Sequence, residues 1–128
     1  MIVGTGIDIV EIVRIEHSLD KFGDKFAERI LTPSEFATFQ GFAAAPLRAR
    51  YLAKRFAMKE AASKALGTGI GQGVSWQDFT TSKNDVGAPQ LQLAGVAKDR
   101  AGQLGVVNAQ VSVSDEQHYV VAMVMLES

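Results

Sequence analysis

The chain of 128 residues has no cysteine, which excludes disulfide bonds and thiolate chemistry and makes a reducing compartment natural. It also lacks the basic start and long apolar stretch of a signal peptide, and no segment approaches the length of a membrane span. It contains no linker, internal repeat or low-complexity segment. These absences predict a cytoplasmic protein that does not enter the membrane.

The composition that is present is typical of a globular protein. Hydrophobic residues make up 47% of the chain and the formal net charge is −1, so we expect one domain over residues 1–128. Charge is unevenly placed, because residues 48–64 hold six basic side chains against the single acid Glu60. Such a cluster suits nucleic acid, a phosphorylated cofactor or an acidic protein, or it is simply a solvated helix face. We expect no nucleic-acid partner, because the whole chain is slightly acidic and carries no recognised binding motif.

Hydrophobic periodicity and turn residues predict an α+β fold with a mainly antiparallel sheet and one long helix. Thr32, Pro33 and Glu35 form a capping box that marks a helix start, so Glu35 has a structural explanation. The remaining predicted elements follow in chain order. They are a first strand to Val10, a helix over 11–21, a short helical stretch near 26–31, a long helix over 46–65, a loop over 67–73, strands over 75–82 and 90–93 around the turn 84–87, a helix over 94–104, and strands over 108–114 and 119–126.

Asp8 stands in the apolar first strand, where a charge is costly to bury without a partner. Strand alternation places it on one face with Gly4 and Gly6, and the missing side chains leave room for something to approach. One alternative is that Asp8 caps the following helix. We favour a role as a ligand.

Glu60 and Lys64 are four residues apart on the long helix, so they lie on one face. A flexible loop, Gly67-Thr68-Gly69, follows at once. Taken alone, this pattern is also that of a surface ion pair and an ordinary helix stop. Combined with Asp8, the carboxylates, the ammonium group and the glycine backbone suit a metal-bound phosphate.

Two segments carry a family resemblance: GTGIDIVEIVRI near the start and FAMKEAASKALGTGI in the middle. Both resemble the signature segments of the holo-acyl-carrier-protein synthase family, the small phosphopantetheinyl transferases of fatty acid synthesis. The similarity continues through RILTPSEF, AKRF, NDVGAP and VSVSDEQHYVVAMV, and so covers almost the whole chain. It implies a phosphopantetheinyl transferase-like fold.

The resemblance also implies a reaction, in which the phosphopantetheine arm of coenzyme A moves to a serine of an acyl carrier protein. Asp8 and Glu60 then hold Mg²⁺, with Mn²⁺ also suitable, and Lys64 contacts a pyrophosphate oxygen. Glu60 is the first choice for the proton acceptor, and Glu35 acting through a water is the second. Coenzyme A is expected to contact Arg55, Lys64, Gly67, Thr68, Gly69, Gly87 and Pro89.

The expected protein partner is an acidic acyl carrier protein. The resemblance places its contacts in the helix after the first strand and beyond, at Arg14, Lys21, Phe22, Phe26, Arg29 and Arg48. Phe22 and Phe26 are also good candidates for the core. Family members of this size imply a homotrimer, with coenzyme A bound where two subunits meet.

Two positions depart from the family pattern. Asp115 stands where relatives often have histidine, and Ala88 stands where they often have lysine. The nearby His118 lies in no matched motif and receives no role. Other possible functions are a non-catalytic module that binds coenzyme A and a transferase that uses coenzyme A as an acyl donor. The second is disfavoured because the chain offers neither a cysteine nor a matched histidine.

Overall fold

The structure is a computed structural model that describes all residues 1–128. Its helices and strands follow the predicted order, and most of them begin and end within one or two residues of the predicted bounds. They are β1 (Ile2–Glu11), α1 (Ile12–Phe22), α2 (Asp24–Ile30), α3 (Pro33–Gly41), α4 (Ala45–Ala65), the short 3₁₀ helix η1 (Trp76–Asp78), β2 (Phe79–Lys83), β3 (Pro89–Leu93), α5 (Gly95–Gln103), β4 (Asn108–Asp115) and β5 (Tyr119–Glu127). The predicted α+β class is confirmed.

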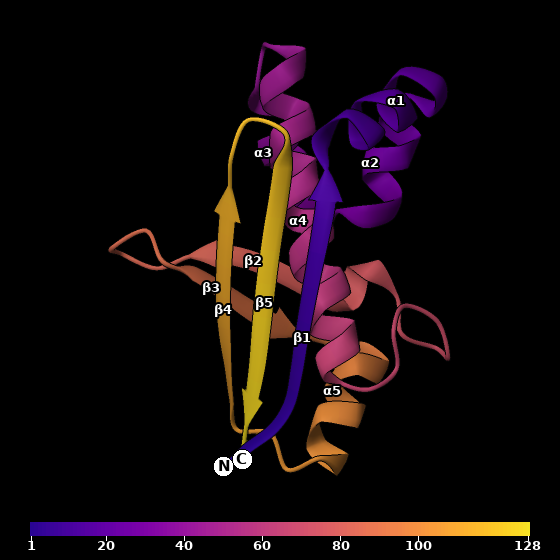
Figure 1. Ribbon diagram of the computed structural model, residues 1–128. Helices are drawn as coiled ribbons and strands as arrows, with labels where there is room; N and C mark the ends of the chain where they lie inside the picture. The colour runs from indigo at the N-terminus through magenta and orange to yellow at the C-terminus, as the bar shows by residue number, and fades with distance from the viewer.

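A three-stranded antiparallel sheet in the order β1-β5-β4 forms one layer, and α4 runs along one of its faces (Figure 1). The core between them joins branched side chains of β5, such as Val120 and Val124, to alanines of α4, such as Ala57 and Ala61. Alanine is a strong helix former with little bulk, so these positions let α4 lie close to the sheet.

Gly4 and Gly6 determine how closely β1 approaches α4. A Cβ atom added to Gly6 would overlap the carbonyl oxygen of Ala61, and one added to Gly4 would overlap that of Ala65. The helix backbone therefore fills the space that these glycines open. The predicted room for a close approach is therefore confirmed, and what approaches is the backbone of α4, which brings Asp8 of β1 against this helix.

The strands β2 and β3 form a separate two-stranded sheet that crosses behind α4 in Figure 1. Their turn is closed by Asn84, whose Oδ1 accepts hydrogen bonds from the amides of Val86 (3.0 Å) and Ala88 (2.9 Å). The strand predicted from residue 75 begins only at Phe79. The preceding residues form η1, because the Ser75 hydroxyl accepts from the Gln77 amide and the Asp78 carboxylate accepts from the Ser75 amide.

The second face of the three-stranded sheet carries no helix (Figure 1). Ile7 and Ile9 of β1 are 62% and 66% exposed there, and Met123 is cross-strand partner to Ile7. The two chain ends lie side by side, with the Ser128 amide donating to the Met1 carbonyl. None of the helices has both the length and the apolar character that crossing a membrane requires.

Candidate active site

Asp8 and Glu60 line one cavity of about 440 Å³ between β1, α1 and α4. The Oδ1 atom of Asp8 accepts a hydrogen bond from Lys64 Nζ at 3.0 Å, and Lys64 also donates to the Ile7 carbonyl at 3.1 Å. The other oxygen of Asp8, Oδ2, is buried and has no hydrogen-bond partner. Asp8 does not cap α1, whose N-cap is Glu11. A buried carboxylate oxygen without a donor is costly, so this atom is suited to a ligand.

The electrostatics of Glu60 also indicate a paired carboxylate site. Burial raises the pKa of Glu60, the negative charge of Asp8 raises it further, and Lys64 opposes these two effects. Lys64 forms its ion pair with Asp8 and not with Glu60, so the alternative of an ordinary Glu–Lys surface pair along the helix is wrong. A carboxylate whose ionised form is disfavoured by a neighbouring negative charge is stabilised when a cation binds beside it.

The donor set fits magnesium. Mg²⁺ is bound in proteins by one or two carboxylates together with phosphate oxygens and waters. Asp8 and Glu60 supply two carboxylates in one cavity, and Asp8 Oδ2 is the oxygen that has no hydrogen-bond partner within the chain. No group of three or more acidic, histidine or cysteine side chains in the structure could hold a metal ion.

The loop after α4 does not offer its amides to phosphate. The amide of Gly67 donates to the Lys64 carbonyl at 2.9 Å, and those of Thr68 and Gly69 donate to the Ser63 carbonyl at 3.2 and 3.1 Å. These bonds satisfy the last carbonyls of the helix. The expectation that these three amides are free phosphate donors is therefore wrong, although the loop does begin one turn from Lys64.

Arg55 lies in a different cavity of about 440 Å³, which Tyr51, Thr81 and Lys83 also line. Its guanidinium carbon stands 4.5 Å from the centre of the Tyr51 ring, and its Nε is buried without a hydrogen-bond partner. Lys83 is the cross-strand partner of Pro89, so this cavity borders the predicted hairpin contacts. Gly87 lies in the exposed turn with φ of 82°.

Glu35 is buried and its two oxygens are fully occupied. Oε1 accepts from the Thr32 amide (2.8 Å) and from Lys59 Nζ (2.6 Å), while Oε2 accepts from the Thr81 amide (2.7 Å) and hydroxyl (2.8 Å). Burial alone would raise the pKa of Glu35, but Lys59 and the hydrogen bonds outweigh it and lower the pKa. The capping role is confirmed, and the geometry contradicts the alternative of Glu35 as a proton acceptor.

The residues predicted to bind the carrier protein fall into two groups. Arg14 is exposed at the rim of the Asp8 cavity, which Phe26 also lines, and Lys21, Phe22 and Arg29 are exposed nearby on α1 and α2. Arg48 instead binds the end of α3, donating to the carbonyls of Phe42 (2.6 Å) and Gln40 (3.2 Å). Its guanidinium is thus engaged within the chain, and its availability to a partner is reduced.

Sequence reasoning overlooked several lining residues. Ser18 and Phe56 line the Asp8 cavity, and Tyr51 and Lys83 line the Arg55 cavity. Phe56 stands inside the matched central segment and was accessible from the sequence, where its apolar character indicated only a core position. Lys83 carries no such signal, because only the packing of β2 against α4 brings it to the cavity of Arg55.

Asp115, at the end of β4, is held by α4. Arg50 contacts its Oδ2 at 2.8 Å and Lys54 its Oδ1 at 3.2 Å. Burial would raise the pKa of Asp115, but hydrogen bonds from Arg50 and Lys54 outweigh it and lower the pKa. Four of the six basic residues counted in the sequence (Arg50, Lys54, Lys59 and Lys64) thus form ion pairs within the chain.

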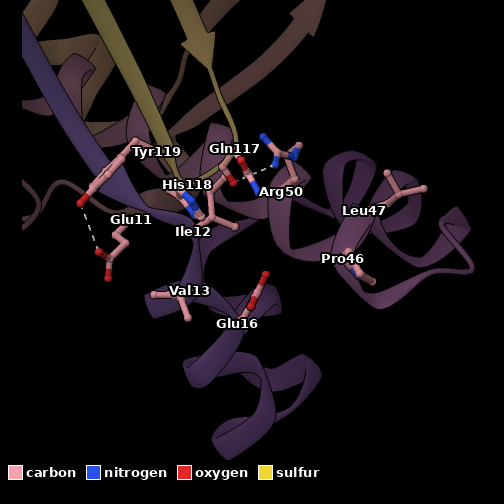
Figure 2. Close-up of a pocket in the computed structure, with 10 residues that line it drawn as sticks. All are labelled: Glu11, Ile12, Val13, Glu16, Pro46, Leu47, Arg50, Gln117, His118 and Tyr119. Atoms are coloured by element: carbon pink, nitrogen blue, oxygen red, sulfur yellow. Dashed lines mark hydrogen bonds between the residues drawn. The ribbon is translucent and has the colours of Figure 1, made fainter.

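A further cavity of about 520 Å³ lies where α1 and α4 begin (Figure 2). His118 and Arg50 line it, and the Tyr119 hydroxyl lies 3.3 Å from Glu11 Oε2. It includes none of the predicted site residues. The backbone carbonyl of His118 accepts a hydrogen bond from the Ile12 amide at 2.9 Å, which joins the start of α1 to the turn between β4 and β5.

Comparison with known proteins agrees with the family indicated by the sequence. Residues 4–124 match the model of the 4'-phosphopantetheinyl transferase superfamily. A holo-acyl-carrier-protein synthase of Shewanella pealeana is 56% identical over 134 residues that cover all of both chains. The crystal structure of the Neisseria meningitidis synthase superposes with a TM-score of 0.91 at 39% identity over 100% of both chains.

The Bacillus anthracis synthase, solved in complex with coenzyme A (3',5'-ADP), gives a TM-score of 0.84 at 41% identity and covers 100% of this chain and 98% of its own. Sequence and structure thus agree along the full length. The chain belongs to the holo-acyl-carrier-protein synthase family of the 4'-phosphopantetheinyl transferase superfamily.

Proposed function

We propose that residues 1–128 act as one enzyme domain that transfers 4'-phosphopantetheine from coenzyme A to a serine of apo acyl carrier protein. The products are holo acyl carrier protein and adenosine 3',5'-bisphosphate, in support of fatty acid synthesis. The observation that carries the proposal is the buried, unpartnered Oδ2 of Asp8 in a cavity shared with Glu60, beside Lys64. The names of the relatives support the same reaction.

The chain's own residues supply three tasks. Glu60 accepts the serine proton, since its carboxylate lines the cavity beside Asp8, where the proposed reaction takes place. The serine oxygen then bonds to the β-phosphorus, and the bond from that phosphorus to the oxygen bridging the two phosphates breaks. Lys64 lies beside Asp8 and neutralises the charge that develops on the leaving phosphate. Magnesium held by Asp8 and Glu60 would polarise the pyrophosphate when bound.

The residues proposed to bind the pyrophosphate and those proposed to bind the nucleotide of coenzyme A lie on different sides of α4. Arg55 and Glu60 are five residues apart, which turns their side chains by about 140° around the helix axis. The cavities that they line share no residue. We therefore assign the pyrophosphate to Asp8, Glu60 and Lys64 of one subunit, and the nucleotide to Arg55 and the hairpin of its neighbour.

The exposed apolar face of the sheet supports the homotrimer that this assignment needs. Ile7 and Ile9 flank Asp8 in β1 and are more than half exposed. A neighbouring subunit that covers this face would bury them next to Asp8 along β1, on the face of the strand opposite to the Asp8 side chain. Ile9→Asp should therefore reduce the mass measured by light scattering to that of a monomer, while Thr5→Asp, at the end of the same face, serves as a milder control. An Ile9→Asp protein that keeps the wild-type mass would contradict this interface.

The reaction is tested by intact-mass spectrometry of apo acyl carrier protein incubated with this protein, coenzyme A and Mg²⁺. The proposal predicts a gain of one phosphopantetheine that is lost when a chelator is added. No gain, with coenzyme A still bound, would favour a non-catalytic module that binds coenzyme A.

A further inference from the structure

Lys59 and Glu35 form a buried ion pair for which the proposed reaction has no use. Lys59 is 0% and Glu35 2% exposed, and their charged atoms are 2.6 Å apart. Lys59 also donates to the Ile30 carbonyl at 2.7 Å, and the carboxylate accepts four hydrogen bonds in all. The network thereby joins the end of α2, the start of α3, the middle of α4 and β2.

Stability alone is a weak explanation for such a pair. Desolvation of two charges offsets much of their attraction, and apolar residues of similar volume are often as stable in the same place. A fully satisfied polar network does something that an apolar contact does not, because its directional bonds allow one relative placement of the segments that it joins. We therefore expect the function of this network to depend on the segments that it holds in place.

The network lies between the two halves of the proposed site. Lys59 directly precedes Glu60 on α4, so anchoring Lys59 sets the rotation of the helix face that presents Glu60. Glu35 and Thr81 line the same cavity as Arg55. Through the Thr81 amide and hydroxyl, Glu35 ties β2, and with it Lys83, to α4.

We propose that Lys59, Glu35 and Thr81 are positioning residues that hold the β2–β3 hairpin at a fixed place on α4, so that the Arg55 cavity is preformed for the nucleotide of coenzyme A. This inference rests on the proposed function. None of the three residues touches the reacting atoms. Their loss should weaken the use of coenzyme A while leaving the use of carrier protein unchanged, because Arg14 and Phe26 lie in the other cavity.

Thr81→Val is the sharpest test, because it removes one donor to Glu35 and keeps the shape and the backbone amide. We expect the KM for coenzyme A to rise about tenfold, with kcat and the KM for carrier protein within about twofold of wild type. Thr81→Ser, which keeps the hydroxyl, should restore the wild-type KM. Thr80→Val, on the neighbouring position of the same strand, is the matched control and should change nothing, because its hydroxyl makes no hydrogen bond within the chain.

A second measurement needs no substrate. Hydrogen exchange of the β2–β3 amides should speed up in Thr81→Val and not in Thr80→Val, because the hairpin loses a tie to Glu35. The double variant Lys59→Met/Glu35→Gln removes both charges and keeps an acceptor for Thr81. It should also raise the KM for coenzyme A, and kcat should fall as well, because Lys59 no longer anchors the helix face that presents Glu60.

The outcomes separate the two proposals. A wild-type protein that transfers nothing refutes the proposed function. Faster hydrogen exchange of the β2–β3 amides in Thr81→Val, but not in Thr80→Val, still supports the positioning role in that case. Wild-type exchange and a wild-type KM for coenzyme A in Thr81→Val overturn the positioning role and leave the function intact. Equal kinetics of Thr81→Val and Thr81→Ser would also overturn it, since the hydroxyl would then be irrelevant.

Discussion

Gly6→Ala tests the close packing of β1 on α4 that brings Asp8 to Glu60. The added Cβ would lie 2.8 Å from the Ala65 amide nitrogen and 2.9 Å from the Ala61 carbonyl carbon, and it would overlap the Ala61 carbonyl oxygen. All three atoms belong to the helix backbone, so no side chain can turn away to relieve the overlap. Strand and helix must move apart.

The cost follows from the nature of these contacts. Overpacking that displaces backbone costs about 3 kcal/mol, at the upper end of its usual range. Replacing glycine by alanine returns up to about 1 kcal/mol by restricting the unfolded chain. The net loss of about 2 kcal/mol should lower the melting temperature by about 7 °C in a chain of this size. Because Asp8 lies two residues further along the same face, transfer should also fall by about tenfold or more.

The assay is thermal unfolding followed by circular dichroism, with the transferase rate measured well below both melting temperatures. Gly102→Ala is the matched control, because nothing lies within 4 Å of its added Cβ and the residue stands in α5. Alanine there should stabilise the protein by about 0.5 kcal/mol. A Gly6→Ala protein as stable and active as wild type would refute the argument that β1 needs glycine against α4.

Four further predictions concern the proposed site and the buried pair. Asp8→Asn and Glu60→Gln should each abolish transfer without changing the circular dichroism spectrum, and near-normal turnover in either would exclude the two-carboxylate site. Because the pKa of Glu60 is raised above 4.5, protons should compete with Mg²⁺ for it, so that the affinity measured by calorimetry already falls as the pH approaches that value from above. An affinity unchanged down to pH 4.5 would contradict this. Because the pKa of Glu35 is lowered by folding, its ionised carboxylate stabilises the folded protein fully above the unfolded value of about 4.5. This contribution is lost as the pH falls through the lower pKa of the folded state. In denaturant unfolding, the free energy of unfolding of Glu35→Gln should therefore fall less with acid than that of wild type. Arg14→Glu should slow association with carrier protein in stopped-flow mixing and reduce its salt dependence, whereas equal rates would place the partner elsewhere.

Much of the fold was predictable because its signals are local. The apolar alternation of β1, the Thr32 capping box and the turn at Asn84 each depend on residues close together in the chain. The 3₁₀ helix η1 was missed because its Ser75 and Asp78 hydrogen bonds compete with a strand pattern that continues into β2. That competition is decided by side-chain bonds and not by hydrophobic period.

The candidate site was predictable only in part. Asp8 was found because a charge inside an apolar strand is unusual, and Glu60 because it stands beside Lys64 in the matched segment. The partners of the lysines were not predictable, since Lys59–Glu35 and Lys64–Asp8 join positions 24 and 56 residues apart. What approaches Gly6 was not predictable for the same reason, because only the packed helix shows what occupies the space beside it.

The most direct test of the account is to locate the metal. Crystals of the protein grown with Mn²⁺ and coenzyme A would be measured for anomalous scattering, which identifies manganese without reference to a model of the site. The account predicts one strong peak per subunit within coordination distance of Asp8 Oδ2 and the Glu60 carboxylate, next to the pyrophosphate. Bound coenzyme A with the peak elsewhere, or with Asp8 Oδ2 still unpartnered, would contradict it.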